Sequence, residues 1–267
     1  MIKSDFDMIT KYVETSGQVK IYAVGDLHAG AIQSNLKGWE RFNQIILDDP
    51  KAYVIFLGDM MNNATKSSVS NPYEDIMRPR DQKIYLKEHL MDLAKADRIL
   101  AILPGNHENR SLKDADDCPL YDVAAKLDLE DIYRDNLALI KLSVGSQKLK
   151  ANAYTILATH GSGGGKLTGS TVNNYERFAI NWEGVDIFFF GHSHKPFITK
   201  PDKMLVDPIH NYVKQHGTIV TTGSSWLAYG GYPVRNLMGP VHQADPDQPM
   251  VFLFSGKQRD KRIRFNW

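Results

Sequence analysis

The amino-acid sequence predicts an α/β fold, and three observations support this prediction. Short apolar runs rich in Val, Ile and Phe end abruptly at glycine or polar residues, which is typical of strands buried on both faces. Longer stretches between these runs carry apolar residues at helical spacing. Residue types that bind metals follow five of the runs directly, and α/β sheets usually bind ligands at the carboxyl ends of their strands.

The predicted strands are the apolar runs themselves. The five that precede metal-binding residue types span residues 19–24, 53–57, 99–103, 154–158 and 186–190. Two stretches, 137–142 and 147–153, flank Val144-Gly145-Ser146 and predict a hairpin. The C-terminal third adds three more expected strands, at residues 217–222, 250–254 and 262–265.

Amphipathic stretches predict the helices. Apolar side chains recur at intervals of three and four in residues 34–47 and 81–96, and more weakly in residues 122–129 and 173–180. Residues 61–80 lack periodicity and predict a long polar loop, a kind of loop that is often functional. The glycine run 161–165 follows a strand directly, so we expect a mobile loop at the rim of a site.

Composition narrows the class of protein. The 267 residues are 42% hydrophobic and 24% charged, with 32 Lys and Arg against 31 Asp and Glu. This balance excludes a wholly basic coat protein and an acidic disordered chain, although a local basic groove remains compatible with it. Cys118 is the only cysteine, which excludes an intrachain disulfide and a cysteine zinc cage. With no bilayer-length apolar run and no apolar leader, we expect a cytoplasmic protein without a membrane partner, folded as one domain over residues 1–267.

Metal-binding residue types stand at the five strand ends in a fixed order. These residues are Asp26 and His28, then Asp59, then Asn106 and His107, then His160, and finally His192 and His194. Carboxylate and amide oxygens combined with imidazoles suit Mn, Fe(II) or Zn, whereas Ca prefers oxygen ligands alone. One carboxylate between two cations can bridge them, and two such metals about 3.5–4 Å apart can activate a shared hydroxide and clamp a phosphate.

The same five blocks carry a family resemblance. They read GDLHAG, LGDMMNN, PGNHENR, THGSG and FGHSHKP, over about 170 residues from Asp26 to His194. This order resembles the signature of the calcineurin-like metallophosphoesterases. The resemblance implies a four-layer sandwich in which two mixed β-sheets lie face to face with helices outside. It also implies hydrolysis of phosphodiester or phosphomonoester bonds.

The resemblance assigns roles position by position. It implies that Asp26, His28 and His194 hold one divalent metal, that Asn106, His160 and His192 hold a second, and that Asp59 bridges both. Manganese is the expected metal, with iron or zinc as alternatives. A hydroxide activated by both metals would attack the phosphorus atom in line, and His107 would protonate the departing oxygen as a general acid.

Two positions depart from the family pattern or extend it. Many members carry an aspartate where this chain has Asn62, so substrate contacts are expected to differ there, although Asn62 and Asn63 could also simply cap the turn. The third block extends to Arg110, as in the Ser/Thr protein phosphatases, whose arginine grips phosphate. An ordinary salt bridge is the alternative for Arg110. The segment TTGSSWLAYGGYPVR resembles segments of phage and prophage metallophosphoesterases.

Three other functions stay open. The first and last blocks are shared with DNA nucleases of the Mre11/SbcD branch, and GNHENR is shared with protein phosphatases. A catalytically inactive scaffold of the same fold, as in retromer, is the non-enzyme alternative, although all seven expected ligands and His107 are present. A phosphoester substrate is the expected partner, and a nucleic acid remains an alternative. The sequence does not predict an oligomeric state.

Other suggestive residues receive ordinary interpretations. Four histidines outside the blocks are expected to be structural or exposed: His89, His210, His216 and His242. The glycine run lacks the Lys-Ser/Thr ending of a P-loop. Trp39, Phe42 and residues 188–190 are expected in the core, and the basic tail 257–267 as an edge strand, with a nucleic-acid contact as the alternative. Tyr73, Tyr229 and Tyr232 fall in predicted loops and could stack on a substrate ring.

Overall fold

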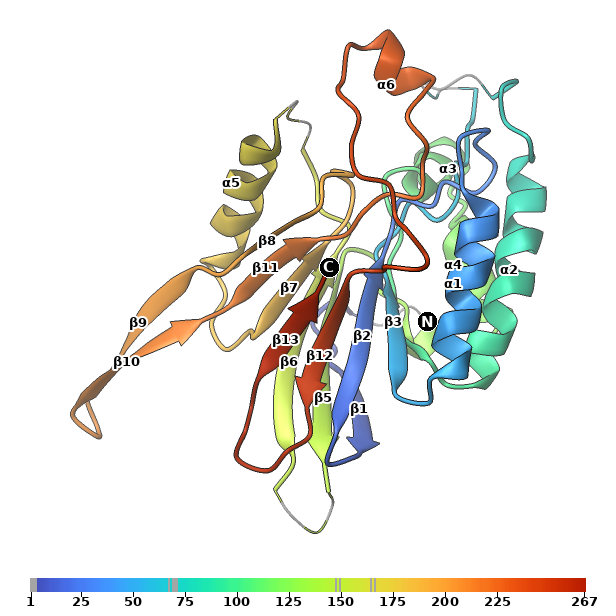
Figure 1. The fold of residues 1–267 in the computed structure, drawn as a ribbon. Helices are drawn as coiled ribbons and strands as arrows, with labels where there is room; N and C mark the ends of the chain where they lie inside the picture. Colours follow the sequence, from blue (N-terminus) through green and yellow to red (C-terminus); the bar gives the residue numbers. More distant parts are fainter. Residues whose placement is uncertain are drawn as a thin grey trace.

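The fold is built on two mixed β-sheets that lie face to face (Figure 1). The computed structural model describes residues 4–66, 68, 72–146, 148, 150–163, 165 and 167–267. The strand order is β1-β5-β6-β7-β11-β8 in the six-stranded sheet and β13-β12-β2-β3-β4 in the five-stranded sheet. Both sheets combine parallel and antiparallel neighbours.

The element bounds are as follows. The five-stranded sheet contains β2 (Gln18–Val24), β3 (Ala52–Phe56), β4 (Ile99–Ile102), β12 (Val251–Ser255) and β13 (Ile263–Asn266). The six-stranded sheet contains β1 (Ile9–Glu14), β5 (Leu137–Gly145), β6 (Asn152–Thr159), β7 (Ile187–Phe190), β8 (Phe197–Thr199) and β11 (Ile219–Thr222). The helices are α1 (Leu36–Asp48), α2 (Pro79–Lys95), α3 (Glu108–Ala115), α4 (Pro119–Ala125), α5 (Thr168–Ala179) and α6 (Tyr232–Arg235), with a 3-10 turn at Glu130–Ile132.

Three hydrophobic clusters separate four layers. The central cluster joins the inner faces of the two sheets, where Ile55 of β3 and Ile156 of β6 are both fully buried. A second cluster packs α1, α2 and α4 on the outer face of the five-stranded sheet, and a third packs α5 on the six-stranded sheet. Helices therefore cover both outer faces (Figure 1). The four-layer sandwich expected from the resemblance is confirmed.

The strands and helices predicted most clearly are present within one or two residues. The apolar runs become β2, β3, β4, β6 and β7, and every residue of β3, β4 and β7 is buried. The two strongly periodic helices are α1 and α2. The basic tail forms β13 at a sheet edge, as predicted. Trp39 and Phe42 lie in the core, also as predicted.

Other predicted elements need correction. The predicted hairpin is present, because β5 pairs antiparallel with β6, the next strand along the chain. Its second strand begins at Asn152 and continues to Thr159, so the strand expected at 147–153 contributes only its last two residues; residues 147 and 149 lie outside the described residues. The helix predicted at 122–129 begins earlier, because Pro119 suits the first turn of α4. The helix predicted at 173–180 begins at Thr168. The sequence analysis did not predict β1, β8, β9, β10, α3, α6 or the 3-10 turn.

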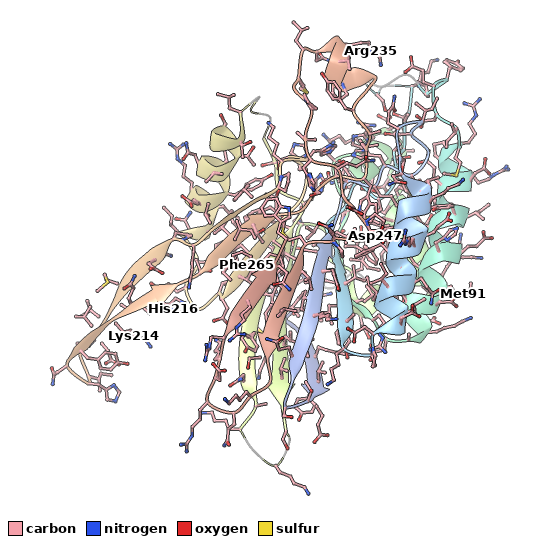
Figure 2. The ribbon with its side chains drawn as sticks, viewed as in Figure 1. Met91, Lys214, His216, Arg235, Asp247 and Phe265 are labelled. Carbon is pink, nitrogen blue, oxygen red and sulfur yellow. The ribbon has the colours of Figure 1, made fainter. Side chains whose placement is uncertain are left out.

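A two-stranded ribbon, β9 (Asp202–Asp207) and β10 (Tyr212–Gly217), extends beyond the six-stranded sheet (Figures 1 and 2). Figure 2 labels Lys214 and His216 on this ribbon, whereas Arg235 lies on α6 above the opposite end of the strands. None of the residues of β9 and β10 is buried, and the apolar runs of these strands, residues 204–206 and 212–213, are shorter than those that identify buried strands. Within the described residues, no helix combines the length and apolar character needed to cross a bilayer.

Candidate metal centre

The predicted ligands gather at the carboxyl ends of five strands. Asp26, Asp59 and Asn106 follow β2, β3 and β4 of the five-stranded sheet, whereas His160 and His192 follow β6 and β7 of the six-stranded sheet. Parallel neighbours place these ends at the same edge, and the stacking of the sheets brings the two edges together. The site therefore spans the boundary between the two sheets.

Backbone geometry directs these side chains inward. Five of the seven predicted ligands have positive φ angles: Asp26 at 56°, His28 at 50°, Asp59 at 51°, His192 at 67° and His194 at 56°. A left-handed conformation is unfavourable for residues with a Cβ atom, and such strain concentrates at functional sites. Strands β2, β3 and β7 are thus followed by sharp turns, which point the ligands after them at the centre instead of along the sheet.

One group of donor atoms consists of Asp26, His28 and His194. His194 Nε2 lies 3.2 Å from Asp26 Oδ1 and 3.4 Å from His28 Nε2. Ligands bonded to one divalent ion at about 2.0–2.2 Å lie about 3.0–3.5 Å from one another in octahedral or tetrahedral arrangements. The spacing of these atoms therefore fits a shared ion, and this group could hold one.

A second group consists of Asp59, Asn106, His160 and His192. His160 Nε2 lies 3.0 Å from Asn106 Oδ1 and 3.3 Å from Asp59 Oδ2, and His192 Nδ1 lies 2.7 Å from Asn106 Oδ1. Asp59, His160 and His192 could also hold an ion. Asp59 Oδ2 is in addition 3.8 Å from His28 Nε2, so this carboxylate faces both groups.

The two buried carboxylates are ionised because of their histidine neighbours. Burial acts to raise the pKa of Asp59, but the adjacent His160 and His107 outweigh it and hold that pKa well below its usual range. Burial likewise acts to raise the pKa of Asp26, and the charge and hydrogen bond of His194 lower it overall. Negative charge at the centre of the site is what a divalent cation requires.

The histidines fall into two electrostatic classes. Burial lowers the pKa of His28 strongly, with His107 adding to the effect, and burial also lowers the pKa of His192. For His160, burial opposes protonation, but Asp59 raises the pKa to about 10, and Asp26 has the same net effect on His194. Positive charge therefore sits beside each carboxylate in the metal-free protein, in the place of the charge that a cation would bring.

Outer contacts fix how the ligands are presented. The Nδ1 of His160 lies 2.7 Å from the carbonyl oxygen of Leu57, which can only accept, so Nδ1 carries the hydrogen and Nε2 faces the centre. Asp59 Oδ1 accepts the backbone N–H of His107 at 2.8 Å, which leaves Oδ2 for the centre. Gly105 makes this contact possible, because a Cβ there would lie 2.1 Å from Asp59 Oδ1. These are the supporting contacts that metal ligands need, and the residues fit divalent ions.

His107 lies beside the centre with both ring nitrogens engaged by its own chain. Nδ1 is 2.8 Å from the carbonyl oxygen of Asn62, and Nε2 is 2.9 Å from the Arg110 guanidinium. A guanidinium only donates and a carbonyl only accepts, so His107 carries its hydrogen on Nδ1. Burial lowers the pKa of His107, and the charge of Arg110 lowers it further. His107 also lies close enough to His28 and Asp59 for these three residues to hold an ion.

Glu108 is a site residue that the sequence reasoning left without a role. Its fully buried carboxylate accepts three backbone N–H groups, from Asp59 at 2.9 Å, Met61 at 2.8 Å and Gly105 at 2.7 Å. It thereby ties the turn after β3 to the turn after β4. Burial and the nearby charge of Asp59 raise the pKa of Glu108 to about 7. In the sequence, the signal for this role was that Glu108 is an acidic residue inside the block PGNHENR.

The two asparagines after β3 are buried parts of the site and do more than cap an exposed turn. Asn63 Nδ2 donates to the carbonyl oxygen of His107 at 2.8 Å and to Ser111 Oγ at 2.9 Å. The Asn62 carbonyl accepts from His107 and, at 3.1 Å, from Arg110. Arg110 therefore contacts a histidine ring and a backbone carbonyl oxygen.

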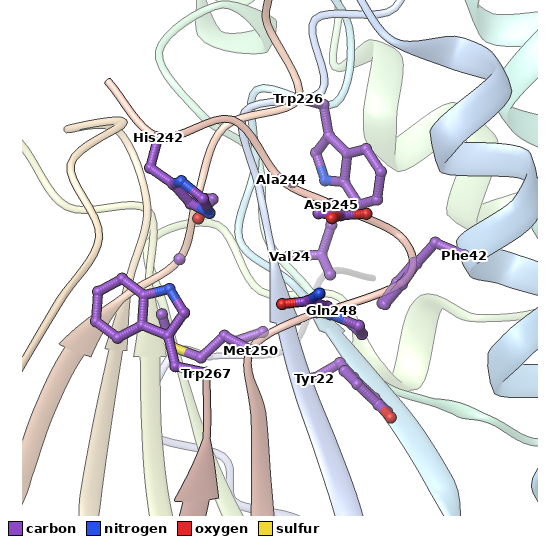
Figure 3. Close-up of a pocket in the computed structure, with 14 residues that line it drawn as sticks. Tyr22, Val24, Phe42, Trp226, His242, Ala244, Asp245, Gln248, Met250 and Trp267 are labelled. Atoms are coloured by element: carbon purple, nitrogen blue, oxygen red, sulfur yellow. The ribbon is translucent and has the colours of Figure 1, made fainter. Parts of the chain in front are cut away.

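The segment after β11 also supports the centre. The backbone N–H of Trp226 and the hydroxyl of Ser225 both donate to the carbonyl oxygen of Asp26, each at 3.1 Å. Trp226 packs edge-on against Trp39 in the core. A pocket of about 40 Å³ on the outer side of β2 is lined by Trp226, Phe42, Trp267 and others (Figure 3). It has room for a few water molecules, and none of its lining residues is a predicted ligand.

The remaining histidines lie outside the metal-binding groups, as expected. His89 stacks on Tyr85 in α2, His210 pairs with Asp207 at 2.9 Å, His216 lies on β10, and His242 lines the pocket in Figure 3. Three earlier predictions fall wholly or partly outside the described residues: Gly164 in the glycine run, residues 67 and 69–71 in the loop 61–80, and the Tyr232 side chain. Tyr73 and Tyr229 are exposed.

Comparison with known proteins gives the family. The calcineurin-like phosphoesterase family matches residues 19–196, which include all seven predicted ligands. No curated protein sequence matches the chain significantly. A solved structure described as the calcineurin-like phosphoesterase YfkN from Bacillus subtilis is similar, with a TM-score of 0.40 and 11% identity over 94% of this chain and 90% of that one. The match over residues 19–196 shows that this chain belongs to the calcineurin-like phosphoesterase family.

Proposed function

We propose that this protein hydrolyses phosphoester bonds with two divalent metal ions. The observation that carries the proposal is the position of Asp59, whose Oδ2 faces both donor groups, at 3.3 Å from His160 and 3.8 Å from His28. One carboxylate shared by two cation sites is the arrangement that two-metal hydrolysis requires. Asp26, His28 and His194 would hold one ion, and Asn106, His160 and His192 the other, with Asp59 between them.

The ions, most suitably manganese, with iron or zinc as alternatives, would lower the pKa of a water molecule and neutralise charge on the phosphate. The chain's own residues contribute the rest. Asp26 and Asp59 supply negative charge to hold the ions, and backbone N–H groups fix the orientation of both carboxylates.

His107 and Arg110 act on the substrate in this proposal. The Arg110 guanidinium donates to His107 Nε2 at 2.9 Å, and the same donors match the oxygens of a phosphate. A bound phosphate would therefore draw Arg110 away from His107. Nε2, which holds no hydrogen while it accepts from Arg110, would then take up a proton from solvent, and the resulting imidazolium would give that proton to the leaving oxygen as a general acid.

The test compares hydrolysis of bis-p-nitrophenyl phosphate and p-nitrophenyl phosphate. Chelator-stripped protein is resupplied with Mn²⁺, and D59N is the control because it removes the charge shared by the two groups. We expect Mn²⁺-dependent release of p-nitrophenolate by the wild type, about two Mn²⁺ bound per chain, and loss of both properties in D59N.

Each outcome separates the alternatives. Activity on the diester would direct the next tests to nucleic acids and cyclic nucleotides, including the nuclease alternative. Activity on the monoester alone would favour a phosphatase. Metal binding without activity on either compound would indicate a selective site. Absence of metal binding would contradict the proposal and favour the scaffold.

A further inference from the structure

The loop between β3 and α2 contacts the site through the carboxylate of Asp75. Asp75 Oδ1 accepts a hydrogen bond from Asn62 Nδ2 at 2.7 Å, although thirteen positions separate the two residues. The fully buried Gln82 in α2 holds the loop in this position, because its Nε2 donates to the carbonyl oxygen of Met77 at 2.8 Å. The Oε1 of Gln82 accepts the backbone N–H of Asn63 at 2.9 Å. One glutamine thus ties both ends of the loop together.

Asn62 connects this carboxylate to the residues proposed to act on the substrate. Its side chain donates to Asp75, and its carbonyl oxygen accepts from His107 Nδ1 at 2.8 Å and from Arg110 Nη1 at 3.1 Å. Asn62 is buried, so competing water has little access to these bonds. Any rotation of the Asn62 peptide would move the acceptor that holds both side chains.

We propose that Asp75 is a positioning residue, which fixes Asn62 and thereby orients the His107–Arg110 pair for the reaction. This inference rests on the proposed function. It also explains the departure from the family pattern at position 62. The side-chain amide of Asn62 needs a hydrogen-bond acceptor, and the carboxylate of Asp75, further along the loop, supplies it.

The contacts of Asp75 are consistent with a carboxylate that is fixed in position by hydrogen bonds. Its side chain is partly buried, which raises its pKa, and hydrogen bonds from Asn62 and Gln82 oppose this rise. The charge of Asp75 also acts on Arg110, after the larger contributions of Asp59 and Glu108. Asp75 is not among the residues that would hold the ions in the proposal, so its loss should leave metal binding intact.

The experiment is a reciprocal exchange at positions 62 and 75. D75A removes the acceptor, D75N keeps an acceptor without the charge, and N62D places two carboxylates against each other. The double variant N62D/D75N restores one amide and one carboxylate with their positions exchanged. D81N is the matched control. Asp81 lies in the first turn of α2, near Asp75 in the sequence. Among the ion pairs of the described residues, its carboxylate pairs only with the neighbouring Arg80.

The readouts are kcat and KM on Mn²⁺-loaded protein, for one aryl phosphoester with a good leaving group and one with a poor leaving group. Bound metal and the unfolding temperature are measured alongside. We expect D75A to lower kcat about tenfold on the poor leaving group, with a smaller loss on the good one and two metals still bound. N62D should lose at least as much, and N62D/D75N should recover to within about threefold of the wild type. D75N should fall between D75A and the wild type, and D81N should match the wild type.

A purely structural role would lower stability and affect both substrates equally, and it would overturn the inference. So would wild-type kcat for D75A on the poor leaving group, or a double variant no better than N62D. If the wild type itself lacks metal-dependent activity, the proposed function fails and this inference fails with it. An active wild type with an unaffected D75A overturns the positioning role alone.

Discussion

His107 shows how neighbouring residues of the chain orient a single side chain of the site. Its Nδ1 hydrogen is held by the carbonyl oxygen of Asn62, and its Nε2 receives a hydrogen bond from Arg110. The Asn62 contact is made by a backbone carbonyl, so it would still hold the ring when a phosphate draws Arg110 away. Its Nε2, the nitrogen that would donate a proton in the proposed reaction, faces Arg110.

Replacement of His107 should separate catalysis from metal binding. H107A is expected to lower kcat about 10²–10⁴-fold on a substrate with a poor leaving group, since that is the usual contribution of general acid–base catalysis. p-Nitrophenolate needs less protonation, so its release should fall by less. Steady-state kinetics and metal analysis of the same preparations check both statements. Unchanged turnover of the poor leaving group, or loss of metal, would contradict the assignment.

The pair of His160 and Asp59 predicts how metal-stripped protein responds to pH. Burial opposes protonation of His160, but Asp59 raises its folded pKa from 6.5 to about 10. The contribution of this pair to stability is therefore fully present below pH 6.5 and is lost as the pH rises toward 10. Urea unfolding at pH 6, 8 and 10 should show a decline in the free energy of unfolding.

The control for this prediction is H160Q, which has no titrating ring. Its free energy of unfolding should fall less than that of the wild type over the same pH range, because the other titrating groups are shared by both proteins. Equal slopes for the two proteins would show that His160 and Asp59 are not coupled in the folded chain.

At the scale of elements, the turns after β3 and β4 depend on close backbone approach. A Cβ at Gly105 would lie 2.1 Å from Asp59 Oδ1 and 2.4 Å from the Asp59 nitrogen, so any side chain would push the two turns apart. Glu108 binds the backbone N–H groups of both turns and holds them in place. Contacts between these turns, more than strand propensity, set the distance between Asp59 and Asn106.

G105A should consequently weaken metal binding and abolish most of the activity. The matched control is G169A in α5, where an added Cβ would meet no atom within 4 Å. Alanine in a helix is favoured over glycine by about 1 kcal/mol or less, so G169A should keep full activity with equal or higher stability. Metal titration, activity and thermal unfolding of both variants give the comparison. Wild-type metal affinity in G105A would refute the role of this close approach.

On the scale of the whole molecule, the site joins the two sheets. Each donor group combines side chains from the five-stranded sheet with histidines that follow β6 or β7 of the six-stranded sheet. The central core already holds the sheets together. Bound cations would add a second connection at one end of this interface, so metal binding and global stability should be linked.

Metal removal should therefore lower the unfolding temperature of the entire molecule. Free Mn²⁺ at 100 times its dissociation constant would add about 2.7 kcal/mol per site to the free energy of unfolding. Calorimetry in Mn²⁺ and in EDTA should show a single transition that shifts upward with metal. D59N should show little or no shift, and an equal shift in D59N would rule out Asp59 as a shared ligand.

The sequence by itself predicted the buried strands and the candidate ligands, and its resemblance to the family predicted the layers. Strands buried on both faces leave uninterrupted apolar runs, and the turn residues that follow them are local in sequence, so both could be recognised without a structure. The same holds for α1 and α2, whose periodicity is strong. The ribbon β9–β10 and the short helix α3 were missed because polar residues dominate both.

Only the tertiary structure decided which residues support the site. Glu108 reaches the nitrogen of Asp59 across 49 positions, and Asp75 reaches Asn62 through the fold of a loop that has no periodic pattern. Such hydrogen bonds form where two backbone segments lie close together in space, and the spacing of residues along the chain does not predict that proximity.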